Sequence, residues 1–131
     1  MITDTATSFA RKEKGTKFQQ EILDSILQQC TLLKKEDLQS APASATKEDI
    51  RVTDKARKVF PFSIECKHLD QGFAKVYDTY KQAHTQMRNL GRADRIEPIA
   101  FIKEKDKEGL AVMSAEYAVG VFRMISLIRS L

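Results

Sequence analysis

The residues of this chain best suited to chemistry lie near its middle, in the tripeptide Glu65-Cys66-Lys67. The tripeptide ends the apolar run Val59–Ile64, and together they predict a buried β-strand over Phe60–Lys67. Side chains alternate along a strand, so Glu65 and Lys67 would share one face. A carboxylate and an ammonium at the end of an apolar strand are costly to bury without partners. These two residues are therefore candidates for a functional site.

Asp49 is the expected partner of this pair, because it opens a second strand-like run, Ile50–Val52. On neighbouring strands, Asp49 and Glu65 would offer two carboxylates, with the Cys66 carbonyl between them. Mg²⁺ takes such oxygen ligands and keeps several waters. Phosphodiester hydrolysis needs a positioned water and stabilisation of negative charge, which Lys67 would assist. The plainer interpretation is a surface salt bridge between Glu65 and Lys67, contributing about 0–1 kcal/mol.

Hydrophobic periodicity and turn residues predict the elements that must position this site. Met1–Lys14 is expected to be a flexible basic tail, followed by one domain over residues 15–131. Thr16 and Gln19 suggest a capping box at the start of the first helix. The order α, β, β, α, β, β, α fits one mixed sheet flanked by helices. The predicted segments are a helix at Thr16–Leu33, a linker at Lys34–Glu48, strands at Ile50–Val52 and Phe60–Lys67, a turn or loop at Thr53–Lys58, a helix at Gln71–Leu90 stopped by Gly91, a hairpin of strands at Pro98–Ile102 and Leu110–Met113, and a helix at Ala115–Leu131.

Composition restricts the class of protein. The chain has 131 residues, 42% of them hydrophobic and 31% charged, which is typical of one soluble domain. No apolar stretch approaches the roughly 20 residues of a membrane span, and the polar first residues do not form a secretory signal. Two cysteines make neither a disulfide framework nor a zinc site. We therefore expect a cytoplasmic protein, and the net charge of +4 mildly favours a polyanionic partner.

Four stretches together resemble small phage-type nucleases of the PD-(D/E)xK superfamily, often described as Holliday-junction-resolvase-like endonucleases. They are Lys14–Ile22, Glu48–Ile50, Phe60–Lys67 and Gln82-Ala83, so the resemblance covers roughly Lys14 to Met113. The string Phe-Pro-Phe-Ser-Ile-Glu-Cys-Lys is its most specific part. The resemblance implies an α/β fold with a restriction-endonuclease-like αβββαβ core, a central mixed sheet flanked by helices. It also implies a Mg²⁺-dependent DNA endonuclease in which Mn²⁺ would substitute.

The resemblance also implies roles for individual residues. Asp49 and Glu65, with the Cys66 backbone carbonyl, would bind the metal, and Lys67 would activate water. Gln82 matches a helix glutamine that often supports the catalytic site. Many members of the superfamily carry a glutamate on the first helix, four residues after a glycine. This chain has Gln19 there, so either Gln19 or the nearby Glu21 would support the site, and the number of metal ions stays open.

The expected partner is DNA, either duplex or branched. Resolution of a four-way junction is the leading expectation and would require a homodimer to cut two strands, with phage-encoded action in a host cytoplasm. The alternatives are a homing or restriction-type duplex endonuclease, or a catalytically silent DNA-binding protein on the same scaffold. A solvated charged turn explains the basic cluster between the two motif strands equally well. The candidate DNA contacts are Arg51, Lys55, Arg57, Lys58 and Ser40.

Overall fold

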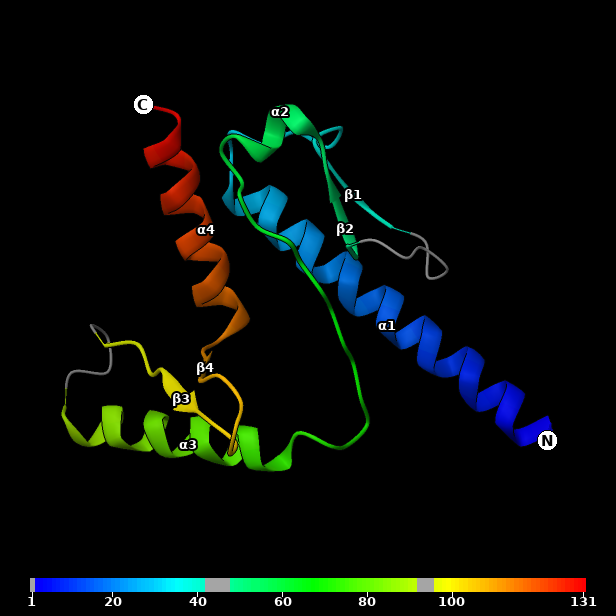
Figure 1. Cartoon of the computed structure of the whole chain (residues 1–131), viewed down its shortest axis with the longest axis vertical. Helices are drawn as coiled ribbons and strands as arrows, with labels where there is room; N and C mark the ends of the chain where they lie inside the picture. Colours follow the sequence, from blue (N-terminus) through cyan, green and yellow to red (C-terminus); the bar gives the residue numbers. More distant parts are fainter. Residues whose placement is uncertain (1, 42–47, 92–95) are drawn as a thin grey trace. The chain divides into compact units, whose positions relative to one another are not determined.

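The computed structural model describes residues 2–41, 48–91 and 96–131, with side chains described from Ala10 onward (Figure 1). Within these residues the protein is mixed α/β, with four helices and two separate two-stranded antiparallel sheets. None of the described helices has the length and apolar character needed to cross a membrane. In chain order the elements are α1 (Ile2–Gln29), β1 (Leu38–Ser40), β2 (Ile50–Val52), α2 (Asp54–Arg57), α3 (Ala74–Asn89), β3 (Ala100–Ile102), β4 (Leu110–Val112) and α4 (Ala115–Arg129).

The chain divides into two compact units. The first unit consists of Met1–Leu69 and Val119–Leu131, and the second consists of Asp70–Ala118. The second unit is therefore inserted into the sequence of the first, and the division falls inside α4. Asp49, Glu65 and Lys67 belong to the first unit, whereas Gln82 belongs to the second.

The first unit is built around the carboxyl-terminal half of α1, and β1 packs against this helix (Figure 1). In the sheet Leu38 pairs with Val52, and Ser40 pairs with Ile50. Leu38 and Ile50 are fully buried, because both strands place alternate side chains against the helix. The buried core of this unit consists of Leu23, Ile26, Cys30, Leu33, Leu38, Ile50, Ala56, Phe60 and Val119.

An aromatic cluster closes the other side of this core. Phe60 has no exposed surface, and its ring centroid lies 5.1 Å from that of Phe62 and 5.4 Å from that of Phe122. Phe62 and Phe122 also contact each other, with centroids 4.4 Å apart. Such ring pairs contribute about 0.5–1.5 kcal/mol beyond the area they bury. The cluster therefore holds the start of the predicted motif strand against α4.

The second unit packs α3 against the β3–β4 hairpin, in which Phe101 pairs with Ala111. Met87 and Ala100 are buried between them, and Gly91 ends the helical segment with a φ of 69°, which favours glycine.

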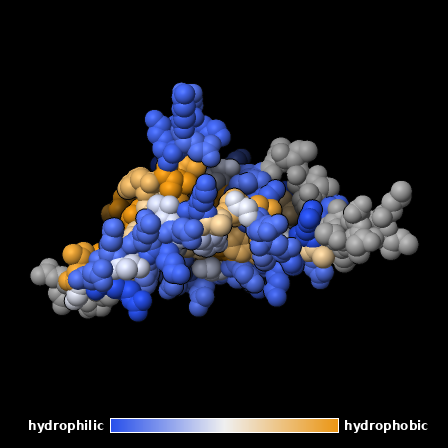
Figure 2. Space-filling model, turned by 90° about the horizontal axis from the view of Figure 1, so that it is seen from below, coloured by the Kyte–Doolittle hydropathy of each residue, from blue (hydrophilic) through white to orange (hydrophobic). Residues whose placement is uncertain are grey.

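Several large apolar side chains remain exposed among the described residues, and Figure 2 shows hydrophobic patches within a mainly hydrophilic face. The most exposed are Tyr77, Leu90, Phe101, Leu110, Met124, Ile128 and Leu131.

Most of the predicted elements after residue 48 are confirmed, including the strand Ile50–Val52, the short turn that forms α2, the helix α3, the β3–β4 hairpin and the helix α4. The first helix begins at Ile2 instead of Thr16, so residues 2–14 are helical and the predicted start of this helix is wrong. Thr16 lies inside this helix and cannot be its amino-terminal cap. The predicted linker contains the strand β1, while its residues 42–47 lie outside the described residues.

The predicted strand Phe60–Lys67 is also wrong. This segment is an irregular trace between α2 and α3 (Figure 1). Pro61 has no N–H to donate, and the Phe62 carbonyl accepts a hydrogen bond from the Arg57 guanidinium at 2.6 Å. The Pro61 nitrogen and the Phe62 carbonyl therefore do not form the hydrogen bonds of a β-ladder. Without this strand, the described strands form two separate sheets instead of the single mixed sheet that we predicted.

Candidate functional site

Two hydrogen bonds hold Asp49 beside the Glu65-Cys66-Lys67 segment. The Asp49 N–H donates to the Ile64 carbonyl at 3.1 Å, and the Cys66 N–H donates to Asp49 Oδ2 at 2.6 Å. The first bond is a single rung of strand-like pairing, and the second is a short, charge-assisted bond to a carboxylate. Asp49 thus lies beside residues that are fifteen and seventeen positions away in sequence.

Exposure alternates along the motif segment even though it forms no regular strand. Ile64 and Cys66 are half-buried, whereas Glu65 and Lys67 are exposed. The carboxylate and the ammonium therefore both face solvent, as the period of two predicts, and neither charge is buried. No ion pair joins Glu65 to Lys67 within the described part of the chain, so the surface salt bridge is not the arrangement adopted.

The electrostatic field of both acidic residues reaches the Cys66 thiol. Burial raises the pKa of Cys66 most, and the negative charges of Asp49 and Glu65 raise it further. A negative charge opposes the formation of a thiolate only when it lies nearby. The two carboxylates thus act on one small region around Cys66.

The donor set around Cys66 suits a hard divalent cation. Two carboxylates and a backbone carbonyl are oxygen ligands, and Mg²⁺ commonly takes one or two carboxylates with water filling the remaining positions. Among the described residues there is no group of three or more His, Cys, Asp or Glu side chains placed to hold a metal ion. A Mg²⁺ ion held by Asp49, Glu65 and the Cys66 carbonyl would keep water in its remaining positions.

Gln19 supports Asp49 from α1. Its side chain is buried, and Nε2 lies 2.7 Å from the Asp49 carbonyl oxygen, 3.0 Å from the Ala41 carbonyl oxygen and 2.6 Å from Ser40 Oγ. Two amide protons are shared among these three oxygens, which joins α1 to the facing ends of β1 and β2. Glu21 is exposed. Of the two residues that the sequence left as alternatives, Gln19 is the one that contacts the backbone of Asp49.

The predicted DNA contacts divide into structural and exposed residues. Arg57 forms an ion pair with Glu48 and donates to the Phe62 carbonyl, so it fixes the start of the motif segment. Burial would raise the pKa of Glu48, but hydrogen bonds from Ser63 and Arg57 and the charge of Arg57 outweigh it and lower that pKa. Ser40 accepts from Gln19. The side chains of Arg51, Lys55 and Lys58 are exposed.

Gln82 is exposed on α3 in the second unit. It lines a shallow hollow together with Asp78, Lys81, Thr85 and Gln86. Its predicted role in supporting Asp49 stays a prediction.

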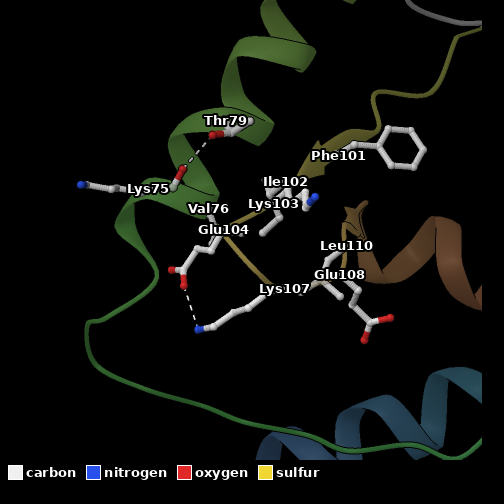
Figure 3. A pocket seen from close by; sticks show the side chains of 10 residues that line it. All are labelled: Lys75, Val76, Thr79, Phe101, Ile102, Lys103, Glu104, Lys107, Glu108 and Leu110. Atoms are coloured by element: carbon white, nitrogen blue, oxygen red, sulfur yellow. Dashed lines mark hydrogen bonds and ion pairs between the residues drawn. The ribbon is translucent and has the colours of Figure 1, made fainter.

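Sequence reasoning missed a second hollow of this unit, between α3 and the β3–β4 hairpin (Figure 3). Val76, Ile102 and Leu110 form its apolar lining, and the Lys107 ammonium pairs with Glu104 at 2.8 Å on its rim. None of the predicted site residues lines it. The sequence offered one signal for this hollow, the exposed apolar residue Phe101 of the hairpin. Single exposed apolar residues are common on protein surfaces, so this signal was weak.

Phe18 was also missed as a neighbour of the site. Its ring packs edge-on against His68, with centroids 6.1 Å apart, and His68 directly follows Lys67. The contact brings a second position of α1 next to the motif segment.

No family model, no curated protein and no solved structure matches this chain.

Proposed function

We propose that this protein is a Mg²⁺-dependent DNA endonuclease that uses Asp49, Glu65 and Lys67. The observation that carries the proposal is the hydrogen bond from the Cys66 N–H to Asp49 Oδ2, at 2.6 Å. This bond fixes a carboxylate from the start of β2 against a segment that presents a second carboxylate and a lysine to solvent. In this proposal the three side chains act on one phosphodiester.

Each residue has a role that follows from its chemistry. Asp49, Glu65 and the Cys66 carbonyl would hold Mg²⁺, which supplies charge stabilisation at the phosphate and lowers the pKa of a bound water. Lys67 stabilises negative charge at the reacting phosphorus or orients the attacking water, because its exposed ammonium has three donors. Gln19 keeps the backbone of Asp49 in place from the opposite side.

The proposal includes a restriction-endonuclease-like core. The order of elements along the chain supports it in part. Apart from the one-turn helix α2, the order α1, β1, β2, motif segment, α3, β3 parallels αβββαβ, with the irregular motif segment in the place of the third strand and the described strands in two separate sheets. The bond from the Asp49 N–H to the Ile64 carbonyl is the kind of pairing that such a strand would make. Branched DNA is the proposed substrate, and a homodimer would place two sites for two cuts.

A catalytically silent DNA-binding protein is the second candidate. It is favoured by Gln19, whose amide faces three protein oxygens and brings no negative charge to the site. A single hydrated cation on two carboxylates then has less protein ligation than a site with an additional glutamate. The two candidates predict the same binding and differ only in cleavage.

Cleavage assays separate the two candidates. The protein is incubated with Mg²⁺ and, separately, with duplex, single-stranded, flap and four-way-junction DNA. We expect cleavage of the junction, and at least a hundredfold loss of rate in Lys67→Ala, which is about the cost of removing one charge-stabilising group. Lys35→Ala is the matched control, because Lys35 is an exposed lysine outside the motif. Absence of cleavage for every substrate, or equal rates for Lys67→Ala and wild type, would contradict catalysis.

A further inference from the structure

The segment Ala10–Lys17 of α1 is strongly charged and exposed to solvent. From Ala10 to Lys17 every described side chain except Gly15 is exposed. Four of these eight residues are basic, namely Arg11, Lys12, Lys14 and Lys17, and Glu13 is the only acidic one. A helix that is polar all round has no apolar face to bury against its own protein. The segment Ala10–Lys17 is therefore a surface of high positive charge.

Helical spacing places part of this charge on one stripe with Phe18. Arg11, Lys14 and Phe18 are related by i, i+3 and i+7, so they lie on the same side of α1. Phe18 contacts His68, the residue after Lys67. With a rise of 1.5 Å per residue, Lys14 lies about 6 Å and Arg11 about 10 Å along the helix axis from Phe18. The positive stripe thus begins at the motif segment and leads away from it.

The neighbouring charged residues of α1 show where the positive stripe ends. Glu21 lies one turn beyond Phe18 on the same side, so the stripe becomes negative there. Lys12 and Glu13 project from other sides of the helix, more than a quarter turn away. The stripe therefore consists of Arg11 and Lys14, with Lys17 at its edge.

We propose that Arg11 and Lys14 bind backbone phosphates of duplex DNA on one side of the Asp49–Glu65–Lys67 site. This inference rests on the proposed function, because it assigns the DNA surface of that site. Duplex DNA carries one negative charge per about 1.7 Å of its axis, so a stripe of about 10 Å spans several phosphates. A membrane surface fits less well, because membrane-bound helices need an apolar face that residues 10–17 do not have.

Equilibrium binding in EDTA tests the stripe without cleavage. Fluorescence anisotropy of a labelled 30-base-pair duplex is measured over a range of salt concentrations, for wild type and for Arg11→Ala/Lys14→Ala. Each lost phosphate contact reduces affinity by about tenfold at 0.1 M salt and the salt slope by about 0.9. We expect the double variant to bind about 100-fold more weakly, with a slope smaller by about 1.8.

The matched control removes the same charge elsewhere. Lys12→Ala/Lys35→Ala also loses two positive charges from exposed positions, one on another side of α1 and one beyond its end. We expect this control to bind within about threefold of wild type, and both doubles to retain wild-type far-ultraviolet circular dichroism. Equal losses in the two doubles, wild-type affinity in Arg11→Ala/Lys14→Ala, or binding to phosphatidylserine vesicles in place of DNA would overturn the proposal.

The outcome for the stripe is distinguishable from the outcome for catalysis. DNA binding that depends on Arg11 and Lys14, without cleavage in Mg²⁺, would retain the stripe and reject the endonuclease. Cleavage that depends on Lys67, with unchanged binding by Arg11→Ala/Lys14→Ala, would retain the endonuclease and reject the stripe.

Discussion

Gln19→Leu should destabilise the first unit substantially, although it replaces a polar residue with an apolar one in a buried position. The substitution removes the only side chain that joins α1 to the backbone of both Ala41 and Asp49 among the described residues. The Asp49 carbonyl keeps a second donor, the Ala41 N–H at 2.8 Å. The Ala41 carbonyl loses the Gln19 donor at a buried residue.

The magnitude follows from the number of protons. Gln19 has two amide protons, and each buried hydrogen bond contributes about 0.5–1.5 kcal/mol net. An unsatisfied Ala41 carbonyl adds about 1 kcal/mol, and burial of the leucine side chain offsets a similar amount. The free energy of unfolding should therefore fall by about 2 kcal/mol. At a typical urea dependence of about 2 kcal/mol per molar, the unfolding midpoint would fall by about 1 M.

Urea titration followed by circular dichroism measures this loss, and Gln20→Leu is its control. Gln20 is the next residue on α1, is exposed, and donates only to Asp24 Oδ1 at 2.8 Å within the helix. Such an i,i+4 pair contributes about 0.2–0.5 kcal/mol. Gln19→Glu should lose at least as much as Gln19→Leu at neutral pH, since a carboxylate would face two carbonyl oxygens. If Gln19→Leu and Gln20→Leu unfold within 0.5 kcal/mol of each other, the structural role assigned to Gln19 is refuted.

Two further predictions concern titrating groups. Because the folded pKa of Glu48 is lowered, its ion pair with Arg57 stabilises the protein above the ordinary value of 4.5, and this stabilisation is lost as the pH falls through the folded pKa. Wild type should exceed Glu48→Gln by less than about 1 kcal/mol at pH 7, since the pair is partly exposed, and urea midpoints should converge below pH 4; a constant gap would contradict the assignment. Glu65→Gln should lower the pKa of Cys66 and speed its alkylation by iodoacetamide at pH 8, because a negative charge near the thiol is removed. Peptide mass spectrometry would follow Cys66 against the fully buried Cys30, and an unchanged Cys66 rate would show that the Glu65 charge does not reach the thiol.

The sequence predicted those elements whose hydrophobic pattern reports their packing. α3, α4 and the β3–β4 hairpin have apolar residues at regular spacing and turn residues at their ends, so periodicity and turn signals locate them. Residues 10–17 of α1 have no buried face to create a pattern, and the polar residues before Gly15 predicted a tail. β1 was missed because Leu38–Ser40 is only three residues long and lies in a stretch rich in serine and alanine.

The candidate site was predicted in part because its residues are close in sequence to recognisable apolar runs. Asp49 beside Cys66 follows from the spacing of two such runs, and the alternating exposure of Glu65 and Lys67 follows from a period of two. The irregular backbone of Phe60–Lys67 depends on Arg57, whose side chain takes the Phe62 carbonyl. The buried position of Gln19 depends on contacts with residues more than twenty positions away. The hydrophobic pattern of a single segment reveals neither a side chain that binds the backbone nor a contact with a distant residue.

The insertion of the second unit has a consequence for the order of folding during synthesis. The core of the first unit needs Val119 and Phe122 from α4, which leave the ribosome long after Ile26, Ile50 and Phe60. Contacts between segments so distant in sequence form late and slow the folding rate. α1 and the β1–β2 pair must therefore wait, with part of their apolar surface uncovered, until α4 has been made. During this interval the exposed Phe60 and Phe62 would make the nascent first unit a target for chaperones.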